Sequence, residues 1–369
     1  MSARTSIALG SGLSCGVTTS HAAYCWGKNE SGQGGNGSTI SSGLPTLVSL
    51  TDQIVAVSAA EASVCALTTT GSVSCWGVVP DGQAAPTTRA TPSRVVSPVQ
   101  FVSLTVGGAF ACGLDKDGLA YCWGANGFGQ LGIGDTLPRS APVAVVNRLK
   151  FTSLSAGYAH VCGTIAGGTT YCWGDNSFLE SGISTRGVTK LLQPTPIETT
   201  VPMTSVTAGT TFSCAIAQGG LAYCWGGNFA AQLGDGTQKS RATPAPVAGG
   251  LHFTALAATR SNSFAAHACG ITTGRVTYCW GANSQGETGG PAETTCISAS
   301  IAAVCNTLPV VVRTLGSTLA VDVGTAHSCA ITAAGSMACW GDNSFGEIGD
   351  GTNVLQTKPF TLSSHLHFH

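Results

Sequence analysis

Charged side chains are scarce in this sequence. Only 9% of its 369 residues are Asp, Glu, Lys or Arg, and the formal net charge is −1, whereas soluble domains typically carry about 25% charged residues. Binding to a phosphate backbone requires clustered lysines and arginines, and no basic block occurs, so we expect no nucleic-acid partner. Because no run of about 18 apolar residues is present either, we expect no membrane insertion.

Signatures of catalysis are missing as well. The sequence contains no H-E-x-x-H or P-loop pattern, and its 17 acidic residues are scattered among candidate loops. His160, His267 and His327 each stand two positions before a cysteine. The other segments hold Leu13, Ser63, Phe110 or Phe212 at that position. A position that tolerates Leu and Phe is typical of packing. We therefore expect no enzyme, no cofactor and no resident metal.

Glycine and hydrophobic residues are abundant instead. The chain has 50 glycines and 15 prolines, and 43% of its residues are hydrophobic. Disorder caused by low hydrophobicity and high charge is therefore excluded. The composition indicates a folded chain that is rich in turns.

The cysteines form a regular pattern. Fourteen of the 16 fall into seven pairs, each separated by ten positions: Cys15 with Cys25, Cys65 with Cys75, Cys112 with Cys122, Cys162 with Cys172, Cys214 with Cys224, Cys269 with Cys279, and Cys329 with Cys339. All seven tryptophans follow the second cysteine of a pair and precede a glycine. The first cysteines recur at intervals of 50, 47, 50, 52, 55 and 60 residues. A period near 50 fits a four-stranded propeller blade, and seven such units occupy the whole chain.

Each unit contains four short strand-like segments. In residues 141–186, the segments 141–146, 151–155, 160–164 and 170–173 are short runs rich in apolar and β-branched residues, with turn residues between them. No unit contains a helical stripe of 10–15 residues. We therefore predict an all-β, seven-bladed β-propeller of four-stranded antiparallel blades, forming a single domain.

The spacing of ten also predicts how paired cysteines meet. It implies a hairpin with a three-residue loop, such as residues 116–118, whose third residue is left-handed and usually glycine. Counted back from that loop, the cysteines fall on a non-hydrogen-bonded pair, where Cα atoms lie about 4.5 Å apart. We interpret the seven pairs as disulfides, with buried free thiols as the alternative. Zinc sites use closer spacings. Disulfides would place the protein in an oxidising compartment: extracellular, periplasmic or at the cell surface.

The two remaining cysteines, Cys296 and Cys305, lie in the longest insertion between units, residues 291–309. We expect them to form a local disulfide that ties down this loop. The alternative is a rigid protruding loop that contacts a partner.

Motifs around the cysteines carry a resemblance. Gly157–Cys162 and Gly324–Cys329 follow G-x-x-H-x-C, and a Gly- and Asn-rich tract follows each C-W-G, as in residues 123–134 and 340–351. Together these motifs resemble the repeats of the regulator of chromosome condensation family, whose members are seven-bladed propellers. The second unit departs from the pattern, since Trp76 is followed by Gly-Val-Val-Pro. The cysteine pairs go beyond the family pattern and suggest an extracytoplasmic variant.

The two ends of the chain are expected to close the ring. Leu366-His367-Phe368 is similar to Leu251-His252-Phe253, which precedes an inner strand, and the strand that should follow it lies near the N-terminus. We therefore expect residues 355–369 to complete the first blade and to remove its open edge. The predicted repeat units are 1–40 with 355–369, 41–90, 91–138, 139–190, 191–240, 241–308 and 309–354.

The leading functional hypothesis is a secreted or surface-displayed, non-enzymatic module that binds a protein through blade loops. The best candidate contacts lie in the inserts at residues 259–263 and 291–309 and in the tracts after C-W-G. The candidate residues are Phe128, Phe178, Phe229, Phe345, Arg260, Asn262 and Glu293. The four phenylalanines could instead pack between blades. With so few charges, we expect recognition to depend little on salt.

Two alternatives remain open. Repeated pockets with aromatic platforms would suit a multivalent lectin that binds a glycan. Low charge and the lack of a unique site would also fit a self-assembling structural subunit of a surface coat or filament.

Overall fold

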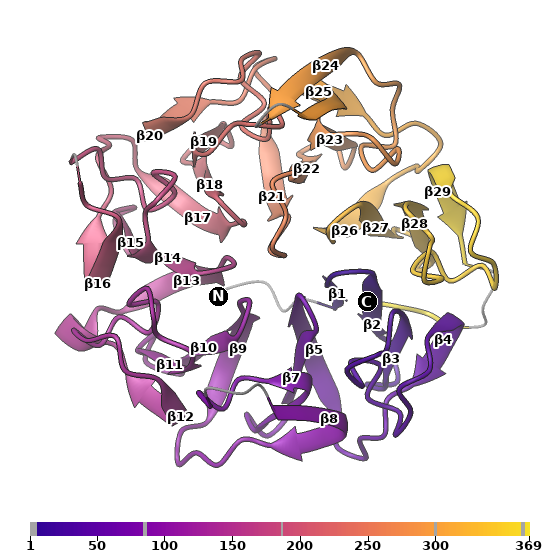
Figure 1. The fold of residues 1–369 in the computed structure, drawn as a ribbon, viewed down its shortest axis with the longest axis horizontal. Coiled ribbons are helices and arrows are strands. Elements are labelled where there is room, and N and C mark those ends of the chain that lie inside the picture. Colours follow the sequence, from indigo (N-terminus) through magenta and orange to yellow (C-terminus); the bar gives the residue numbers. More distant parts are fainter. Residues whose placement is uncertain (1–5, 84–86, 186, 299–300, 363–365) are drawn as a thin grey trace.

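The computed structural model describes residues 6–83, 87–185, 187–298, 301–362 and 366–369. Seven antiparallel sheets stand around a central axis like the blades of a propeller (Figure 1). The predicted all-β, seven-bladed fold is therefore confirmed. The one described helical segment is the short 3-10 turn Val146–Arg148, so no described helix is long and apolar enough to cross a membrane.

The first four sheets follow one plan, in which each strand pairs with the next along the chain. The first contains β1 (Ile7–Leu9), β2 (Leu13–Val17), β3 (Ala23–Gly27) and β4 (Ser42–Leu47). The second contains β5 (Ile54–Ala60), β6 (Ser63–Thr68), β7 (Val73–Val79) and β8 (Thr87–Arg94). The third contains β9 (Phe101–Val106), β10 (Phe110–Asp115), β11 (Ala120–Gly124) and β12 (Arg139–Ala144). The fourth contains β13 (Phe151–Ala156), β14 (His160–Ile165), β15 (Thr170–Asp175) and β16 (Lys190–Pro196).

The last three sheets repeat the plan with one addition. The fifth contains β17 (Met203–Ala208), β18 (Phe212–Ala217), β19 (Ala222–Gly226) and β20 (Arg241–Pro246). The sixth contains β21 (Phe253–Ala258), β22 (His267–Thr272), β23 (Thr277–Ala282), β24 (Thr294–Ser298) and β25 (Ile301–Val311). The seventh contains β26 (Thr318–Val323), β27 (His327–Thr332), β28 (Met337–Gly341) and β29 (Gln356–Thr361). The predicted units and the sheets are offset by about one strand, since Ser42–Leu47 pairs with β3 rather than joining residues 54–94.

Each predicted cysteine pair is a disulfide across the two middle strands of its blade. In the third blade, Cys112 lies opposite Cys122 in the register, and their Cα atoms are 4.1 Å apart. The turn between them is the predicted three-residue loop, closed by the amide of Asp115 donating to the carbonyl of Leu119. Gly118 is left-handed, with φ of 81°.

The other six blades repeat this bridge, so the predicted pairing is confirmed throughout the ring. The second cysteine of each pair lies on the third strand of its blade, directly opposite the first. The bridges join Cys15 to Cys25, Cys65 to Cys75, Cys162 to Cys172, Cys214 to Cys224, Cys269 to Cys279, and Cys329 to Cys339. The alternative of buried free thiols is wrong, because all 16 cysteines are paired.

Two turns place a side chain in the left-handed position. His21 has φ of 63° and Arg275 has φ of 60°, where the other turns hold glycine. The hairpin geometry therefore persists where the preferred residue is missing. This is expected if the flanking disulfide and strand register determine the turn.

The ring is closed by a shorter segment than predicted. Phe368 forms a bridge to Thr18, and its amide donates to the carbonyl of Gly335 at 3.0 Å. Phe151 holds the equivalent place in the fourth blade, where it faces Ile165 and donates to Gly118. The prediction that residues 355–369 all belong to the first blade is wrong for β29, which pairs with β28 in the seventh blade.

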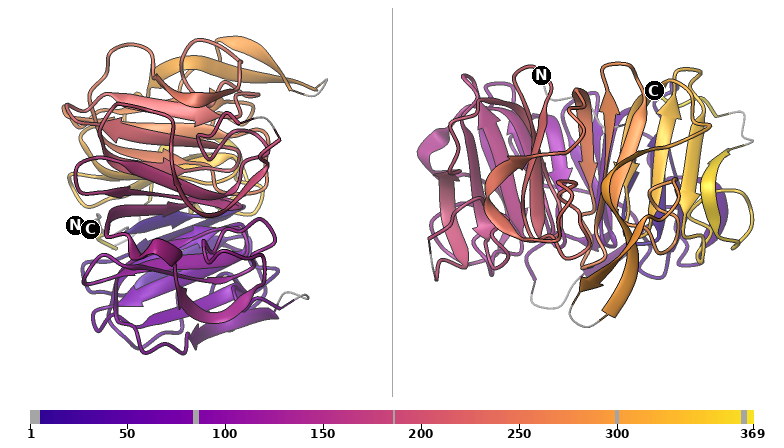
Figure 2. Two further views of the ribbon diagram at one scale, coloured as in Figure 1. Left: turned by 90° about the vertical axis from the view of Figure 1, so that its left-hand side faces the viewer. Right: turned by 90° about the horizontal axis from the view of Figure 1, so that it is seen from above.

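The insertion in the sixth blade is a β-hairpin rather than a loop. Strand β24 pairs with the first half of β25 and becomes a fifth strand at the outer edge. Cys296 and Cys305 form a disulfide and are buried against Ala231 of the fifth blade. Figure 2 shows the hairpin projecting beyond the rest of the ring.

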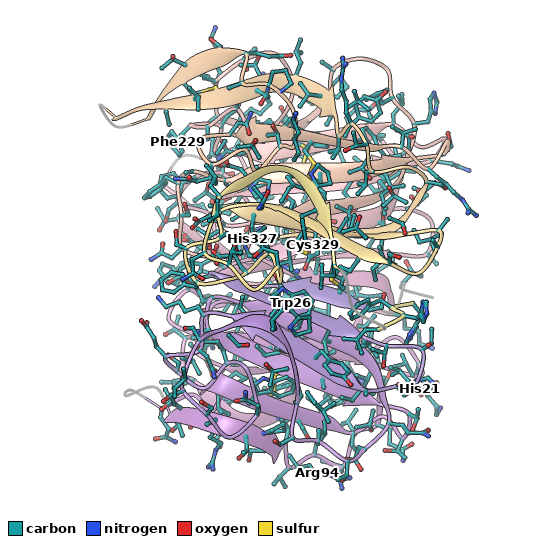
Figure 3. The ribbon with its side chains drawn as sticks, turned by 90° about the vertical axis from the view of Figure 1, so that its right-hand side faces the viewer. His21, Trp26, Arg94, Phe229, His327 and Cys329 are labelled. Carbon is teal, nitrogen blue, oxygen red and sulfur yellow. A yellow bond between two sulfur atoms is a disulfide. The ribbon has the colours of Figure 1, made fainter. Side chains whose placement is uncertain are left out.

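The tryptophans fill the joints between blades. Each indole is buried, and Trp76 of the second blade packs with Leu13 and Cys15 of the first. In six of the seven joints the indole nitrogen donates to a carbonyl of the preceding blade, as Trp26 does to Glu347 at 2.9 Å. Trp26 lies in the interior of the disc (Figure 3). The invariable C-W-G is thus the unit that seals one blade to the next.

Candidate functional site

The connections between blade strands gather at two opposite faces. The link between the two innermost strands and the tract after C-W-G lie at the same face, because the tract donates to the link. Examples are Ala125 to Ala109 at 3.0 Å and Asp175 to Ala159 at 3.0 Å. We call this side the cap face. The cysteine-flanked three-residue turns form the opposite side, which we call the turn face.

An asparagine and a Gln or Glu fold each regular tract on the cap face. In the third blade, Asn126 accepts from the amide of Leu131 and donates to carbonyls of Asp135 and Leu137. Gln130 accepts from the amide of Phe128 at 2.9 Å. These bonds satisfy backbone groups that no strand pairs, so the tract is rigid without secondary structure. They also fix where the tract phenylalanine emerges.

One connection on the cap face is much longer than the others. Residues 259–266, which we call the cap segment, join β21 to β22 with eight residues, whereas the other six inner connections have two or three. Figure 1 shows this loop running from β21 toward the centre of the ring. The segment therefore covers part of the mouth of the central channel.

The cap segment is anchored to three other blades. The hydroxyl of Thr210, in the fifth blade, donates to the carbonyls of Thr259 and Ser261, at 2.9 and 2.5 Å. Ser261 contacts Thr325 of the seventh blade at 2.5 Å. The amide of Asn262 donates to Glu61, which belongs to the second blade, across the channel. Such a network indicates a fixed structural element rather than a mobile lid.

A buried ion pair holds the base of the cap segment. Arg260 lies 2.6 Å from Asp322, and their side chains are 11% and 6% exposed. Asp322 also accepts from the amide of Leu9 at 2.9 Å, so it links three blades. Burial raises the pKa of Asp322, while Arg260 and the amide act in the opposite direction. Arg260 was predicted as a candidate partner contact. Its side chain is instead largely buried and forms an ion pair with Asp322.

The tip of the cap segment completes an aromatic cluster. Phe264 stands edge to face with Phe178 and Phe229, with ring centroids 5.6 and 6.0 Å apart, and Phe178 lies 5.5 Å from Phe229. Phe264 is 52% exposed. We call these three residues the aromatic cluster. Edge-to-face packing orders the rings and leaves an apolar surface open to solvent.

The remaining sequence candidates are dispersed. Phe128 is 43% exposed on the third blade. Phe345 is half-buried, and the ammonium of Lys28 lies 4.8 Å from its ring centre. Asn262 is exposed on the cap segment, and Glu293 is exposed at the start of the sixth-blade hairpin. The structure therefore brings together two of the seven candidates, Phe178 and Phe229.

Sequence reasoning missed Phe264, Glu61 and Asp322. The predicted insert ended at residue 263, one position before the phenylalanine that completes the cluster. The length of the cap segment was the available signal. The residues that contact the cap segment lie in blades far apart in the sequence, and no sequence pattern pointed to them.

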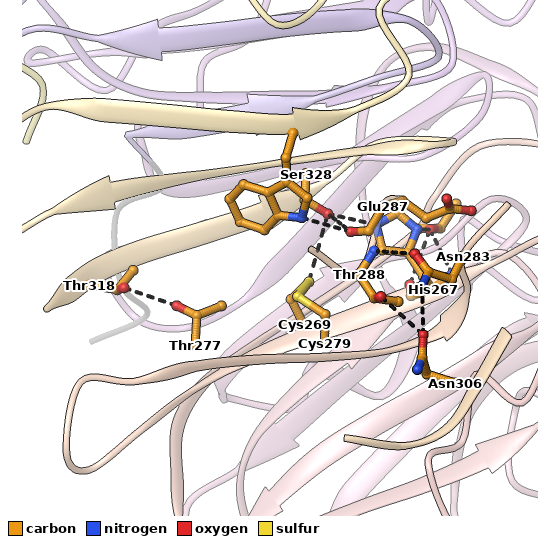
Figure 4. Close-up of a disulfide and its surroundings, with 12 residues drawn as sticks. His267, Cys269, Thr277, Cys279, Asn283, Glu287, Thr288, Asn306, Thr318 and Ser328 are labelled. Carbon is orange, nitrogen blue, oxygen red and sulfur yellow. Dashed lines mark hydrogen bonds between the residues drawn. A yellow bond between two sulfur atoms is a disulfide. The ribbon is translucent and has the colours of Figure 1, made fainter. Parts of the chain in front are cut away.

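The buried histidines form a second set of polar groups, within the joints. His160 lies 2.8 Å from the Ser213 hydroxyl of the next blade, and that hydroxyl donates to the Glu180 carbonyl at 2.9 Å. The indole of Trp225 donates to the same carbonyl. His267 with Ser328 and Glu287 repeats this arrangement beside the Cys269–Cys279 disulfide (Figure 4).

A third joint has the same composition. The imidazole of His327 is hydrogen-bonded to the Ser14 hydroxyl at 3.0 Å, and that hydroxyl donates to the carbonyl of Glu347. All three histidines are at most 1% exposed. Burial lowers the pKa of His160 and His267 to about 3 and that of His327 to about 4. A buried neutral imidazole beside a buried serine cannot reach a substrate. Burial supports the prediction that this position serves packing, and Nδ1 of His160 has no hydrogen-bond partner among the described residues.

Three other joints have a different composition. Where the histidine is replaced by Leu13, Phe110 or Phe212, the serine is replaced by Val64, Val161 or Ala268, and the glutamate by Gln33, Gln130 or Gln232. The joint before Trp123 has neither set, and the Trp123 indole nitrogen has no hydrogen-bond partner among the described residues. Three positions on three separate segments therefore change together.

The glutamates of the polar joints are themselves buried. Burial, reinforced by the nearby carboxylate of Asp175, raises the pKa of Glu180 to about 8. Burial also raises the pKa of Glu287 and that of Glu347 to about 7. Near neutral pH a substantial fraction of these side chains is therefore protonated, which reduces the cost of burying them.

Clefts on the turn face offer little chemistry. A groove of about 490 Å³ lies between the second and third blades, bordered by Thr68–Gly71, Pro98–Val102 and Asp115–Asp117. Its charged residues are exposed turn residues. No group of three His, Cys, Asp or Glu side chains among the described residues is placed to hold a metal ion. Near the C-terminus, the ring of His369 lies edge to face with that of His21.

Comparison with known families identifies the repeat. Profiles of the regulator of chromosome condensation (RCC1) repeat match residues 20–67 and 117–163, and, in a second version, residues 5–33, 101–130 and 319–347. The human E3 ubiquitin-protein ligase HERC2 is 28% identical over 174 residues, which is 46% of this chain. The aligned region is 3% of the length of HERC2, so the match concerns a small part of that enzyme.

Solved structures share the fold. Prp20p from Saccharomyces cerevisiae superposes with a TM-score of 0.80 at 19% identity, over 93% of this chain and 86% of its own. Human WBSCR16 gives 0.72 at 18% identity, over 88% and 85%. The ectodomain of the Physcomitrella patens receptor kinase CR4 gives 0.58 at 19% identity, over 92% and 74%. RCC1-repeat profiles thus match several parts of this chain, and its fold is that of a seven-bladed β-propeller with a disulfide in each blade.

Proposed function

We propose that this chain is an extracytoplasmic, non-enzymatic module that binds a partner protein through its cap face. The observation that carries the proposal is the aromatic cluster, an ordered and partly exposed apolar group at the tip of the longest inner connection. Aromatic anchors surrounded by polar groups are typical of the energetic centres of protein interfaces. The cap segment supplies the polar surroundings through its backbone, Asn262 and nearby hydroxyl groups.

Relatives of the same fold support a binding role. Prp20p has binding properties toward Gsp1p and histones, and a yeast RCC1 protein has been captured bound to Kap60. Those partners belong to those proteins. What transfers is the general use of this scaffold as a protein-binding surface.

Eight disulfides support the location outside the cytosol. Reducing compartments keep thiols reduced, so a chain with every cysteine paired fits an oxidising one. An ectodomain of a plant receptor kinase shares the fold, which agrees with use of the scaffold outside the cell.

The cap face also determines how binding should respond to salt. The aromatic cluster is apolar, and Arg260, the cation nearest to it in sequence, is buried in its ion pair with Asp322. Affinity should therefore fall little as salt is added, since few charges are screened. A steep loss of affinity with salt would contradict recognition by this cluster.

Site-specific photo-cross-linking tests the proposal. A photoreactive residue at Asn262, on the cap face, should capture a specific protein at the native surface. The same residue at Thr70, exposed in a turn of the turn face, serves as the matched control and should capture none. Phe264→Ala should abolish the cross-link at position 262 without lowering the melting temperature, because Phe264 is half exposed.

Two results would overturn the proposal. Equal capture at positions 262 and 70 would show that the cap face is not the binding face. Glycan-array binding by the wild type that Phe264→Ala abolishes, without a protein cross-link, would assign the cluster to a lectin instead.

A further inference from the structure

The outer edges of the blades differ in one place. The outermost strand of each regular blade contains a proline one position before the residue that faces the second cysteine. These prolines are Pro45, Pro92, Pro142, Pro194, Pro244, Pro309 and Pro359. Proline cannot donate to a neighbouring strand, and natural sheets use it to prevent pairing between edges. All seven regular edges are therefore blocked against strand addition.

Strand β24 lacks this protection. It adds a fifth strand to the sixth blade, outside the proline-bearing β25. Its sequence, Thr294–Ser298, contains no proline and no charged residue. Its outer edge pairs with no other strand in the part of the chain that the structure describes. Unpaired backbone groups on such an edge are a template for another strand.

The edge is also pre-organised. The Cys296–Cys305 disulfide ties β24 to β25, and both cysteines pack against Ala231 of the neighbouring blade. A strand already held in extended form loses little conformational entropy on pairing. The hairpin projects from the ring on the cap face (Figure 2), which sets β24 apart from the edges of the other blades.

We propose that β24 is a self-association edge, at which a second copy of this chain adds its own β24 in antiparallel register. The strand is compatible with itself: pairing centred on Cys296 sets position 294 opposite position 298 and position 295 opposite position 297, and none of these residues is charged. Because the other edges are blocked, the contact is two-fold and closed, giving a dimer rather than a fibre. A five-residue strand pair is a small interface, so the dimer is weak.

Sedimentation velocity over a range from about 1 µM to about 500 µM, where small interfaces associate, tests this inference. Wild type should shift from monomer to dimer. Thr295→Lys should raise the dissociation constant at least about tenfold, because lysine is the residue that natural edges use against pairing. Thr295→Val should preserve the dimer. The matched control is Thr243→Lys on the proline-bearing strand β20, which should dimerise like wild type.

A second readout does not depend on the stability of the variants. A photoreactive residue at position 295 should cross-link two chains through residues 294–298. A monomer throughout the concentration range, equal dimerisation of the two lysine variants, or cross-links outside β24 would each overturn the inference. These measurements use the purified chain alone, so they are independent of the partner proposed above.

Discussion

The two faces of the ring differ in how closely the blades repeat one another. On the turn face, seven three-residue turns share one geometry, even where His21 or Arg275 replaces glycine. On the cap face, one inner connection is lengthened into the cap segment, the second blade lacks the regular tract, and the sixth blade gains a hairpin. The face that repeats serves the scaffold, and the face that varies can carry specificity.

The joints between blades show the same contrast in the interior. Polar joints combine a histidine, a serine and a glutamate, and apolar joints combine a large apolar residue, a small apolar residue and a glutamine. Both types accept the indole hydrogen bond at one carbonyl, as Trp173 to Gln130 and Trp225 to Glu180 illustrate. The geometry is thus the same while the titratable groups differ, so the two types should respond differently to pH.

The largest expected effect is at the cap segment. Arg260→Ala would leave Asp322 buried without its cation, and breaking such a pair typically costs about 3–5 kcal/mol. Urea unfolding should show this loss, and Arg260→Leu with Asp322→Leu should restore most of it. Lys116→Ala is the turn-face control, because the Lys116–Asp117 pair is exposed, and it should leave stability unchanged. Equal losses of stability in the two alanine variants would contradict the proposed difference between the two faces.

Removing a disulfide should lower stability more in a regular blade than in the inserted hairpin of the sixth blade. Cys112→Ala with Cys122→Ala opens a short loop within a blade, which should cost about 2–3 kcal/mol in the chain-entropy model. Cys296→Ala with Cys305→Ala loosens a hairpin outside the regular blade, so global stability should fall by less than about 1 kcal/mol. Thermal unfolding of both double variants checks the ranking. A larger loss from the hairpin pair would show that the insertion supports the ring.

Exchange of a polar joint for an apolar one should change acid sensitivity. Burial depresses the pKa of His160 in the folded state from 6.5 to about 3. Its contribution to stability is therefore complete above pH 6.5 and is lost as pH falls toward 3. His160→Phe with Ser213→Val copies the Phe110–Val161 joint and should flatten this part of the stability curve. Melting temperatures between pH 4 and 7 that fall in parallel for variant and wild type would contradict the assignment.

The smallest expected effect has the opposite sign. The pKa of Glu347 is raised in the folded state from 4.5 to about 7, so its favourable contribution is complete below pH 4.5 and is lost as pH rises through 7. Glu347→Gln copies the apolar joints. Its melting temperature should match that of wild type near pH 4.5 and exceed it at pH 8. Gln130→Glu should introduce the same loss at pH 8 into the third blade.

The sequence predicted the scaffold well, because side chains alternate between the two faces of a strand. The spacing between two cysteines therefore determines how they meet across a hairpin. A spacing of ten between cysteines determined the loop length, the register and the disulfide in every blade. The similarity of Phe368 to Phe253 revealed the ring closure. The extent of that closure was overestimated, since nothing in residues 355–362 distinguishes a strand of the seventh blade from one of the first.

The candidate site was predicted only in part, because it depends on contacts between blades. Phe178 and Phe229 stood out at repeated positions, whereas Phe264 gained its role from a loop that crosses to neighbouring blades. Arg260 was predicted to contact a partner, but in the folded chain its charge is paired with that of Asp322, 62 positions away. The joint triads escaped notice for the same reason, since their members lie on three segments that meet only in the folded ring.

Hydrogen exchange of the oxidised protein, alone and with the partner captured at position 262, tests the central claim most directly. The account predicts slower exchange in residues 259–266 and in the tracts that carry Phe178 and Phe229, with the seven turns unchanged. Protection of the turns, with the cap segment unaffected, would place recognition on the opposite face and contradict it.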